Sequence, residues 1–342
     1  MKSIKLFLLL GLIVGFITLQ SCGSNNTTTT TQGDWVKSIP FKGVPRTGLV
    51  TFTIGEKVYA GLGYNSTGYL SDFYVLDGGI WKALASFPTG TNNDNLRERA
   101  TAFSVGGNGY VGLGYNRNNS GVAQQLNTFW KYDPAANKWT QLKDFLGGRR
   151  YNVVSVGIGE NGYVGTGYDG TSWFGDFWKY APGTDTWTEI VSYAGDKREG
   201  ASAFVLNGKM MLAGGKNNGL YISDLWEFDP ATTVWTSRTP ATNDEDYSDF
   251  KTAVRRSNAV FFGFNNYGYM ALGASPSLTL SIYELDPTTY KWTQKSNFEG
   301  SVRQNAIWFI TGGKVYVGMG EAGSQYYDDI WEWRPLDESS TN

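Results

Sequence analysis

Residues 150–187 read RYNVVSVGIGENGYVGTGYDGTSWFGDFWKYAPGTDTW, and this stretch decides the fold. It contains an arginine, an alternating apolar segment, an Asn-Gly pair, a segment ending in Gly-x-Gly, an aspartate before aromatic residues, and a tryptophan. Alternation broken by turn residues is typical of short β-strands joined in hairpins. Asn-Gly tolerates the positive φ values of a two-residue hairpin turn. The stretch therefore predicts four antiparallel strands.

The same order of residues recurs six times, so internal repetition governs the fold. The repeats are led by Arg46, Arg99, Arg150, Arg198, Arg256 and Arg303. A second strand opens thirteen residues after five of these, at Tyr59, Tyr163, Met211, Tyr269 and Tyr316, and eleven residues after Arg99, at Tyr110. The third strand starts at Asp72, Thr128, Asp176, Asp224, Ser281 and Asp329. The fourth opens on Trp81, Trp139, Trp187, Trp235 and Trp292.

Small residues end every second strand, as in Gly61-Leu62-Gly63 and Gly318-Met319-Gly320. Glycine weakens a strand unless another part of the chain approaches its backbone closely. Its recurrence at one register predicts recurrent close packing.

The sixth repeat has no fourth-strand tryptophan, because the chain runs out at Arg334-Pro335-Leu336. Trp35 lies eleven residues before Arg46, the spacing that also separates Trp139 from Arg150. We therefore expect residues 35 to about 39 to form the outer strand of the sixth blade. A ring closed in this way joins its two ends and exposes only short blade edges.

These repeats resemble the kelch-repeat β-propeller family over about residues 34–336. The resemblance implies an all-β, six-bladed kelch β-propeller with four-stranded blades, closed by the N-terminal strand. The chain departs from the family pattern because most repeats have Gly-x-Gly rather than adjacent glycines, and because repeats two and five lack the aspartate.

The N-terminus has the features of a bacterial lipoprotein. Lys2 and Lys5 precede an apolar run that ends in a lipobox-like Leu19-Gln20-Ser21-Cys22. We expect residues 1–21 to be a signal peptide, 22–33 a flexible tether, 34–336 the propeller and 337–342 a C-terminal tail. Cys22, the only cysteine, would carry the lipid, so no disulfide within the chain can form. The expected location is the cell envelope, at the outer membrane, facing the periplasm or the cell surface.

Composition excludes several classes of function. Without residues 1–21 the chain has 27 basic and 31 acidic residues, a net charge of −4, which disfavours nucleic-acid binding. The sequence has no histidine, which rules out Ser-His-Asp and Cys-His nucleophiles and histidine-ligated metals. The copper site of galactose-oxidase-type kelch propellers is excluded for the same reason. We expect no cofactor, no bound metal and a monomer.

The repeat arginines begin the innermost strands, so they are expected at the channel mouth. As a binding collar they would grip a carboxylate, a phosphate or an acidic peptide with paired hydrogen bonds. In related kelch domains, some such arginines contact acidic peptides or sugar acids. As architecture, each would pair with a nearby carboxylate or cap carbonyls of the next blade. The sequence leaves both interpretations open.

Loops of variable length fall on the same face, and variable loops on a rigid scaffold are where binding residues concentrate. Their polar and aromatic residues suit a carbohydrate or a peptide. The candidate ligand-binding loop residues are Asn65, Asn116, Asp169, Trp173, Asn217 and Tyr326, accompanied by Tyr64, Tyr69, Tyr115, Tyr168 and Tyr221. The alternative to ligand binding for all of these residues is packing at the rim of the propeller. The acidic stretch 243–249 lacks the spacing of a calcium loop, and we expect a solvated insertion.

The sequence leaves two main functions open, and a purely structural role in the envelope, which would show no pocket, is a third. The first is a binding module for a carbohydrate or protein ligand, with membrane contact only through the lipid. The second is a sugar isomerase, because the six-bladed exported kelch propellers include sialic-acid mutarotases. Its acid–base group would be Glu98, Glu199 or Glu321. A mutarotase predicts a deep pocket holding two or more arginines and one carboxylate, whereas a binding module predicts a broad and shallow face.

Overall fold

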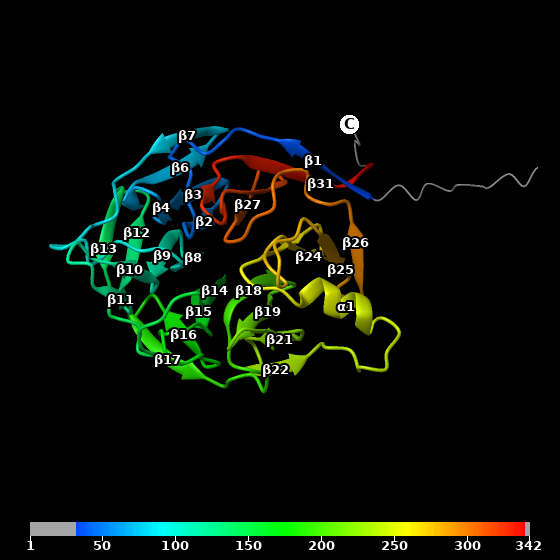
Figure 1. The fold of residues 1–342 in the computed structure, drawn as a ribbon. Helices are drawn as coiled ribbons and strands as arrows, with labels where there is room; N and C mark the ends of the chain where they lie inside the picture. Colours follow the sequence, from blue (N-terminus) through cyan, green and yellow to red (C-terminus); the bar gives the residue numbers. More distant parts are fainter. Residues whose placement is uncertain (1–31, 339–342) are drawn as a thin grey trace, which may run out of the picture. The chain divides into compact units, whose positions relative to one another are not determined.

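The computed structural model describes residues 32–338, which form six four-stranded antiparallel sheets around a central channel (Figure 1). Blade one consists of β2 (Val50–Ile54), β3 (Lys57–Gly61), β6 (Phe73–Asp77) and β7 (Ile80–Ala83). Blade two consists of β8 (Thr101–Val105), β9 (Asn108–Gly112), β12 (Phe129–Asp133) and β13 (Lys138–Gln141). Blade three consists of β14 (Val154–Ile158), β15 (Asn161–Gly165), β16 (Phe177–Ala181) and β17 (Thr186–Ile190).

Blade four consists of β18 (Glu199–Leu206), β19 (Lys209–Asn217), β21 (Leu225–Asp229) and β22 (Val234–Ser237). Blade five consists of β23 (Val260–Phe264), β24 (Tyr267–Ala271), β25 (Ile282–Leu285) and β26 (Trp292–Lys295). Blade six consists of β27 (Ile307–Thr311), β28 (Lys314–Gly318), β31 (Ile330–Glu338) and β1 (Gln32–Lys37). The predicted all-β, six-bladed β-propeller with four-stranded blades is confirmed.

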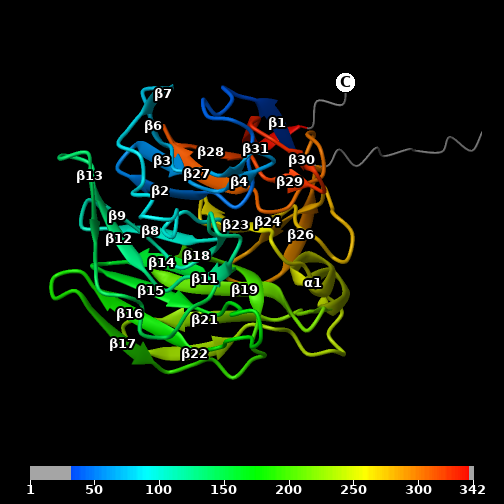
Figure 2. The same ribbon diagram turned by 60° about the vertical axis from the view of Figure 1, so that its left-hand side comes forward.

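The first strands of the blades contact one another in a closed sequence around the channel. The connections between second and third strands lie at the end where these inner strands begin, which we call the loop face. They carry short hairpin pairs, namely β4 (Tyr64–Asn65) with β5 (Gly68–Tyr69), β10 (Tyr115–Arg117) with β11 (Ala123–Gln125), and β29 (Glu321–Ala322) with β30 (Gln325–Tyr326). In blade four, β20 (Leu220–Tyr221) pairs with the end of β19. Figure 2 shows the same ring of blades turned by 60°.

The Asn-Gly pairs do not all form the turns that the sequence predicts. Asn207-Gly208 is a hairpin turn, with both residues at positive φ. The pair at 161–162 instead opens β15, because the turn is formed by the two residues before it. There a Cβ on Gly162 would lie 2.1 Å from the Phe103 ring of the preceding blade. This glycine therefore allows close packing between blades.

The Gly-x-Gly segments confirm the predicted close approach. Gly63 and Gly320 have φ values of +92° and +91°, and a Cβ on either would lie 2.5 Å from a carbonyl oxygen. The middle residues, Leu62 and Met319, also have positive φ, at 62° in both cases. Consecutive residues of this kind bend the chain sharply, which sends it from the blade onto the loop face.

The ring is closed by the first strand, as the tryptophan spacing predicts. β1 pairs antiparallel with β31 and places Trp35 opposite Trp333. The Trp35 ring lies 4.8 Å from that of Trp333 and 4.9 Å from that of Phe298 in blade five. The strand spans residues 32–37 rather than 35–39, so Gln32 and Gly33, which the sequence places in the tether, already belong to the sheet.

An aromatic lock joins consecutive blades. In five blades a ring six residues after the fourth-strand tryptophan packs against the tryptophan of the next blade, edge-on in four of them, as Phe87 does with Trp139 at 4.9 Å and Phe145 with Trp187 at 4.8 Å. Blade four has an alanine at this position, Ala241. There α1 (Tyr247–Val254) buries Phe250 in one cluster with Trp292. The acidic insertion thus forms a short helix that completes the lock, which the sequence does not predict.

The signal peptide, Cys22 and nearly all of the tether lie outside the described residues. Within residues 32–338, no helix is long and apolar enough to cross a membrane.

Replacing Trp35 with alanine should destabilise the ring. Trp35 is only 2% exposed and contacts both blade six and blade five, so its loss should lower the free energy of unfolding by about 3–5 kcal/mol. Ile39→Ala, at a residue 55% exposed, should change it by less than about 0.5 kcal/mol. Urea denaturation of both variants measures the difference, and equal midpoints would refute the closure.

Candidate functional site

Five of the predicted collar arginines do not face the channel. Arg46, Arg150, Arg198 and Arg303 have no exposed surface, and Arg256 is 2% exposed. The expected collar of arginines is therefore wrong in its placement, and these five side chains are not accessible to a ligand in this structure. They have the structural role that the sequence offered as the alternative to ligand binding.

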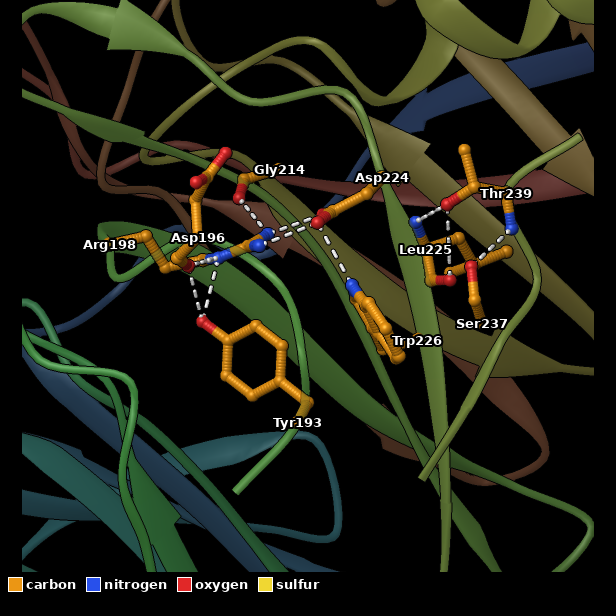
Figure 3. Close-up of polar contacts among 9 residues, drawn as sticks. All are labelled: Tyr193, Asp196, Arg198, Gly214, Asp224, Leu225, Trp226, Ser237 and Thr239. Atoms are coloured by element: carbon orange, nitrogen blue, oxygen red, sulfur yellow. Dashed lines mark hydrogen bonds and ion pairs between the residues drawn. The ribbon is translucent and has the colours of Figure 1, made fainter. Parts of the chain in front are cut away.

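Each buried guanidinium holds the bend at the end of the second strand. Arg198 donates from Nη1 to the Gly214 carbonyl (3.0 Å) and pairs with both carboxylate oxygens of Asp224 (2.5 and 2.7 Å), as Figure 3 shows. The Trp226 indole donates to the same carboxylate at 2.9 Å. Arg46, Arg150 and Arg303 pair in the same way with Asp72, Asp176 and Asp329. Unpaired, a buried carbonyl at such a bend would cost about 1–3 kcal/mol.

Blades two and five, which lack the aspartate, keep the arginine with neutral partners. Arg97 binds the backbone carbonyl and hydroxyl of Thr128, and Arg256 binds those of Ser281. Burial lowers the pKa of Arg97 to about 9 and that of Arg256 to about 10, so both remain charged at neutral pH.

The repeat arginine of blade two is Arg97 and not Arg99. Arg97 has no exposed surface and donates to the Leu113 carbonyl sixteen residues on, the separation found in every other blade. Counted from Arg97, Tyr110 is thirteen residues away, so the hairpin turn is not shortened. Arg99 is consequently a residue outside the repeat pattern, and it is the one predicted collar arginine that reaches the channel.

A chain of backbone hydrogen bonds encircles the channel where the inner strands begin. It runs through the residues two positions after each repeat arginine, which are Gly48, Arg99, Asn152, Gly200, Asn258 and Asn305. The amides of the last five donate to the preceding residue's carbonyl at 2.8–3.1 Å. All six residues have positive φ, between 51° and 61°. Arg99 is the only one of the six that is neither glycine nor asparagine, and such a residue costs about 1–2 kcal/mol in this conformation.

These six residues line a recess of about 150 Å³, which we call the channel mouth. Beyond it the channel contains further spaces of about 220 and 480 Å³. The Arg99 side chain is 35% exposed, and it lies 3.7 Å from the carboxylate of Glu98 and 4.0 Å from that of Glu321. Asn152 donates to Glu199 at 2.8 Å, and Asn305 donates to Glu321 at 3.0 Å. The mouth therefore combines one guanidinium, three carboxylates and three amides.

Burial raises the pKa of one carboxylate of the channel mouth. Glu98 is 8% exposed, and this burial raises its pKa, which nearby Arg99 lowers in part and Glu321 raises further. A carboxyl of this kind exchanges a proton closer to neutral pH than an ordinary glutamate does.

An aromatic arc borders the channel mouth, and we use this term for Tyr326, Tyr64, Tyr69, Tyr115, Tyr151, Tyr168 and Trp173. Neighbouring rings lie 4.6–6.4 Å apart along most of its length. Trp173 stacks on Tyr168 at 4.6 Å and donates from its indole to Glu199 at 3.4 Å. Burial and Glu199 raise the pKa of Tyr151 to about 12, so its phenol stays protonated and can donate a hydrogen bond. The arc thus joins directly to the carboxylates of the mouth.

The other predicted loop residues lie elsewhere. Asn65 is 7% exposed and accepts hydrogen bonds from Thr67 within its own turn. Asn116 is fully buried and donates to carbonyls of residues 93, 94 and 96, while Asp169 closes a turn through the amides of Thr171 and Ser172. Asn217 pairs with Leu220 in blade four. Among the predicted ligand-binding residues, the structure brings together Arg99, Trp173 and Tyr326, and it adds the three glutamates.

Sequence reasoning missed Tyr151, Asn152, Asn258 and Asn305. The signal was present, because residues that tolerate positive φ recur two positions after the repeat arginines once blade two is aligned on Arg97.

The acidic insertion contains no evident metal centre. Within residues 32–338, no group of three or more His, Cys, Asp or Glu residues is placed to hold a metal ion. Asp246 pairs with Lys291 at 2.6 Å, and Asp244 accepts a hydrogen bond from the Asp246 amide.

Comparison with known proteins gives three findings. The Kelch motif matches residues 114–146 and 197–241. N-acetylneuraminate epimerase of Shigella flexneri serotype 5b is 37% identical over 108 residues, which are 30% of this chain and 26% of that protein. The Escherichia coli K12 protein of the same name is 36% identical over the same shares. The chain thus aligns with about a quarter of the length of these curated relatives.

A solved structure described as "Structure of YjhT" has the same fold. It superimposes with a TM-score of 0.71 and 20% sequence identity, covering 85% of this chain and 95% of that one.

Removing the carboxylate beside Arg303 should cost stability in a pH-dependent way. Burial opposes ionisation of Asp329, but hydrogen bonds from Arg303 and Trp331 outweigh it and hold its pKa below 3.8. The stabilisation is therefore present at neutral pH and decreases as pH falls below about 4. Asp329→Asn should lower the free energy of unfolding at pH 7 by about 3 kcal/mol and flatten this acid limb.

The control is Asp337→Asn, at an exposed carboxylate 3.9 Å from Arg334. It should leave the unfolding curves at pH 7 and pH 3 unchanged. If Asp329→Asn behaved like this control, the buried pair would not stabilise the blade.

Proposed function

We propose that this chain, a six-bladed kelch-repeat β-propeller, binds carbohydrate at the channel mouth and along the aromatic arc. The observation that carries the proposal is the junction of Trp173 with Glu199, where a stacked indole meets a carboxylate of the mouth. Sugars present flat faces of C–H groups that pack on aromatic rings, and hydroxyls that need both donors and acceptors. The mouth offers carboxylate acceptors beside guanidinium and amide donors.

The charge of the mouth favours a neutral sugar. Three carboxylates face a single guanidinium, which already lies near two of them. An acidic group on the ligand would meet more negative than positive charge, and like charges in a partly buried site repel. The recess of about 150 Å³ continues into channel spaces of about 220 and 480 Å³, so its size does not separate the two candidates. The excess of carboxylates supports a module that binds a neutral sugar over an enzyme that acts on a sugar acid.

Sugar epimerisation is the second candidate, favoured by one observation in the site. Glu98, whose pKa burial raises, lies beside Arg99, and such a carboxyl suits the modest acid–base help that anomer exchange requires. Relatives aligned over part of the chain are named N-acetylneuraminate epimerase. In this alternative Arg99 would hold the carboxylate of the sugar acid and Glu98 would transfer the proton.

Export as a lipoprotein completes the proposal. The lipobox-like Leu19–Cys22 precedes the closing strand, so a lipid on Cys22 would hold the propeller at the outer membrane. Cys22→Ala should move the protein from the membrane fraction to the soluble fraction after cell lysis. Persistence in the membrane fraction after a carbonate wash would contradict lipid anchoring.

Binding can be tested on an array of neutral and acidic glycans. We expect signal on neutral oligosaccharides, and at least tenfold weaker binding for Trp173→Ala and for Arg99→Asn, because stacking on the arc and donors in the mouth are lost. Tyr221→Ala removes an aromatic ring outside the arc and should bind as the wild type does. No glycan signal, or equal binding by all variants, would contradict the proposal.

The same proteins decide between the two candidates. Nuclear magnetic resonance follows the exchange of N-acetylneuraminate anomers with and without protein. Under the binding proposal the exchange rate should not change. Acceleration by the wild type that Glu98→Gln abolishes would instead establish the epimerase and overturn the binding module.

A further inference from the structure

A second recess lies between blades six and one, away from the channel mouth. We call it the closing groove and define it by Ile39, Leu76, Gly78, Gly79, Phe309 and Tyr316. Its volume is about 1,010 Å³. The turns after β2, β6 and β27 line it, together with Pro134 and Ala135 of the blade-two turn, and these turns belong to the face opposite the loop face. A ligand at the channel mouth and an occupant of the closing groove could therefore be bound at the same time.

The groove exists because blade one has a shorter turn than blades two to five. Between their third and fourth strands, those blades carry four-residue turns whose last residue is Asn137, Asp185, Thr233 or Tyr290. Blade one has only Gly78 and Gly79 between its paired strands, and glycine has no side chain to extend.

In blades two, three and five that last residue bonds to the preceding blade, whereas Thr233 of blade four bonds to Thr232 of its own turn. Asn137 accepts hydrogen bonds from the Ala85 amide (2.9 Å) and from the Tyr132 hydroxyl. Asp185 accepts from the Lys143 amide at 3.2 Å, and Tyr290 donates to Glu227 at 2.6 Å. The Ala85 amide lies four residues after Trp81, the fourth-strand tryptophan of blade one. The equivalent amide of blade six, four residues after Trp35, belongs to Ile39, a groove residue that is 55% exposed.

An aromatic ring is also missing at this junction. At four other junctions the tyrosine of the second strand contacts a ring of the next blade, as Tyr59 does with Tyr132 at 5.7 Å and Tyr110 with Tyr180 at 5.6 Å. Tyr163 and Tyr269 meet Phe228 and Trp333 in the same way, whereas blade four has Met211 packed in one cluster with Leu285. In the closing groove Tyr316 faces Leu76. The groove thus lacks the aromatic ring that four junctions supply and the side-chain oxygen that Asn137 and Asp185 supply at two of them.

The charges at the rim are already paired, which indicates an uncharged contact. Asp77 lies 3.4 Å from Lys57 and 3.1 Å from Lys82, and Lys314 lies 3.1 Å from Glu332. An occupant would therefore be selected by its ring and its hydrogen-bond acceptor rather than by net charge.

We propose that the closing groove is the docking site for a turn of a partner protein that carries an aromatic residue beside an asparagine or aspartate. Such a turn would supply what blades two and three build from their own chain. Its ring would pack between Tyr316 and Leu76, and its side-chain oxygen would accept from the Ile39 amide. The blade-two segment Tyr132–Trp139, YDPAANKW, is the natural template for this occupant.

The test uses that peptide as the probe, labelled for fluorescence anisotropy. The wild-type chain should bind YDPAANKW, and should bind YDPAAAKW at least fivefold more weakly because the side-chain oxygen is gone. A variant in which Pro-Ala-Ala-Asn replaces Gly78-Gly79 fills its own groove, so its affinity should fall at least tenfold and its melting temperature should rise. If this variant does not fold, Leu76→Tyr restores the missing ring and should weaken binding likewise.

Several outcomes would overturn the proposal. These are no binding of the peptide to the wild type, equal binding to wild type and variants, or equal competition by N-acetyl-tyrosinamide, which would identify a small aromatic ligand. A dimer of the wild type that the turn replacement dissociates would show that a second copy fills the groove instead. Glycan binding should be unchanged in both groove variants, which separates this test from that of the proposed function.

Discussion

The guanidinium inside each blade is the interaction on which the rest of the propeller depends. The bend after the second strand needs consecutive residues at positive φ, and it leaves the carbonyl of its middle residue inside the protein. An arginine sixteen residues earlier donates to this carbonyl in every blade. An aspartate in four blades and a hydroxyl residue in two complete its hydrogen bonds. A buried charge is tolerated only when it is satisfied in this way, which explains why these arginines cannot also serve a ligand.

Fixing that bend frees the neighbouring positions for function. The residue two positions after each arginine reaches the channel mouth, where its backbone belongs to the chain of hydrogen bonds around the channel. Glycine or asparagine occupies five of these six positions, and both tolerate positive φ. Blade two instead places Arg99 there, in a less favourable conformation, with Glu98 beside it. Positions at which one repeat departs from the others, as blade two does at Arg99, are where a repeat protein is expected to carry a functional site.

The sequence is sufficient to predict the six-bladed architecture, because the blades are recognised from the spacing of repeated residues. Trp35 could be assigned to blade six from one repeated interval, and the structure pairs it with Trp333. The assignment of Arg99 is wrong although the spacing of the other repeats favours Arg97, which lies thirteen residues before Tyr110. The aromatic arc was predicted in part from Tyr64, Tyr115 and Trp173, whereas its contact with Glu199 depends on how blades three and four meet. The closing groove could not be predicted from residue types, since it results from side chains that two glycines lack.

Closure by β1 has a consequence for the order in which the chain assembles. The first strand of the propeller pairs with its last, and Gln32 lies opposite Glu338, 306 positions later. Bringing segments this distant together costs about 5 kcal/mol of chain entropy, which neighbouring blades must offset before the two strands meet. Blades one to five can form from local contacts as the chain emerges, whereas blade six is complete only after β31 has been made. Until then β1 has no partner strand, and an unpaired strand edge is a template for pairing with other chains.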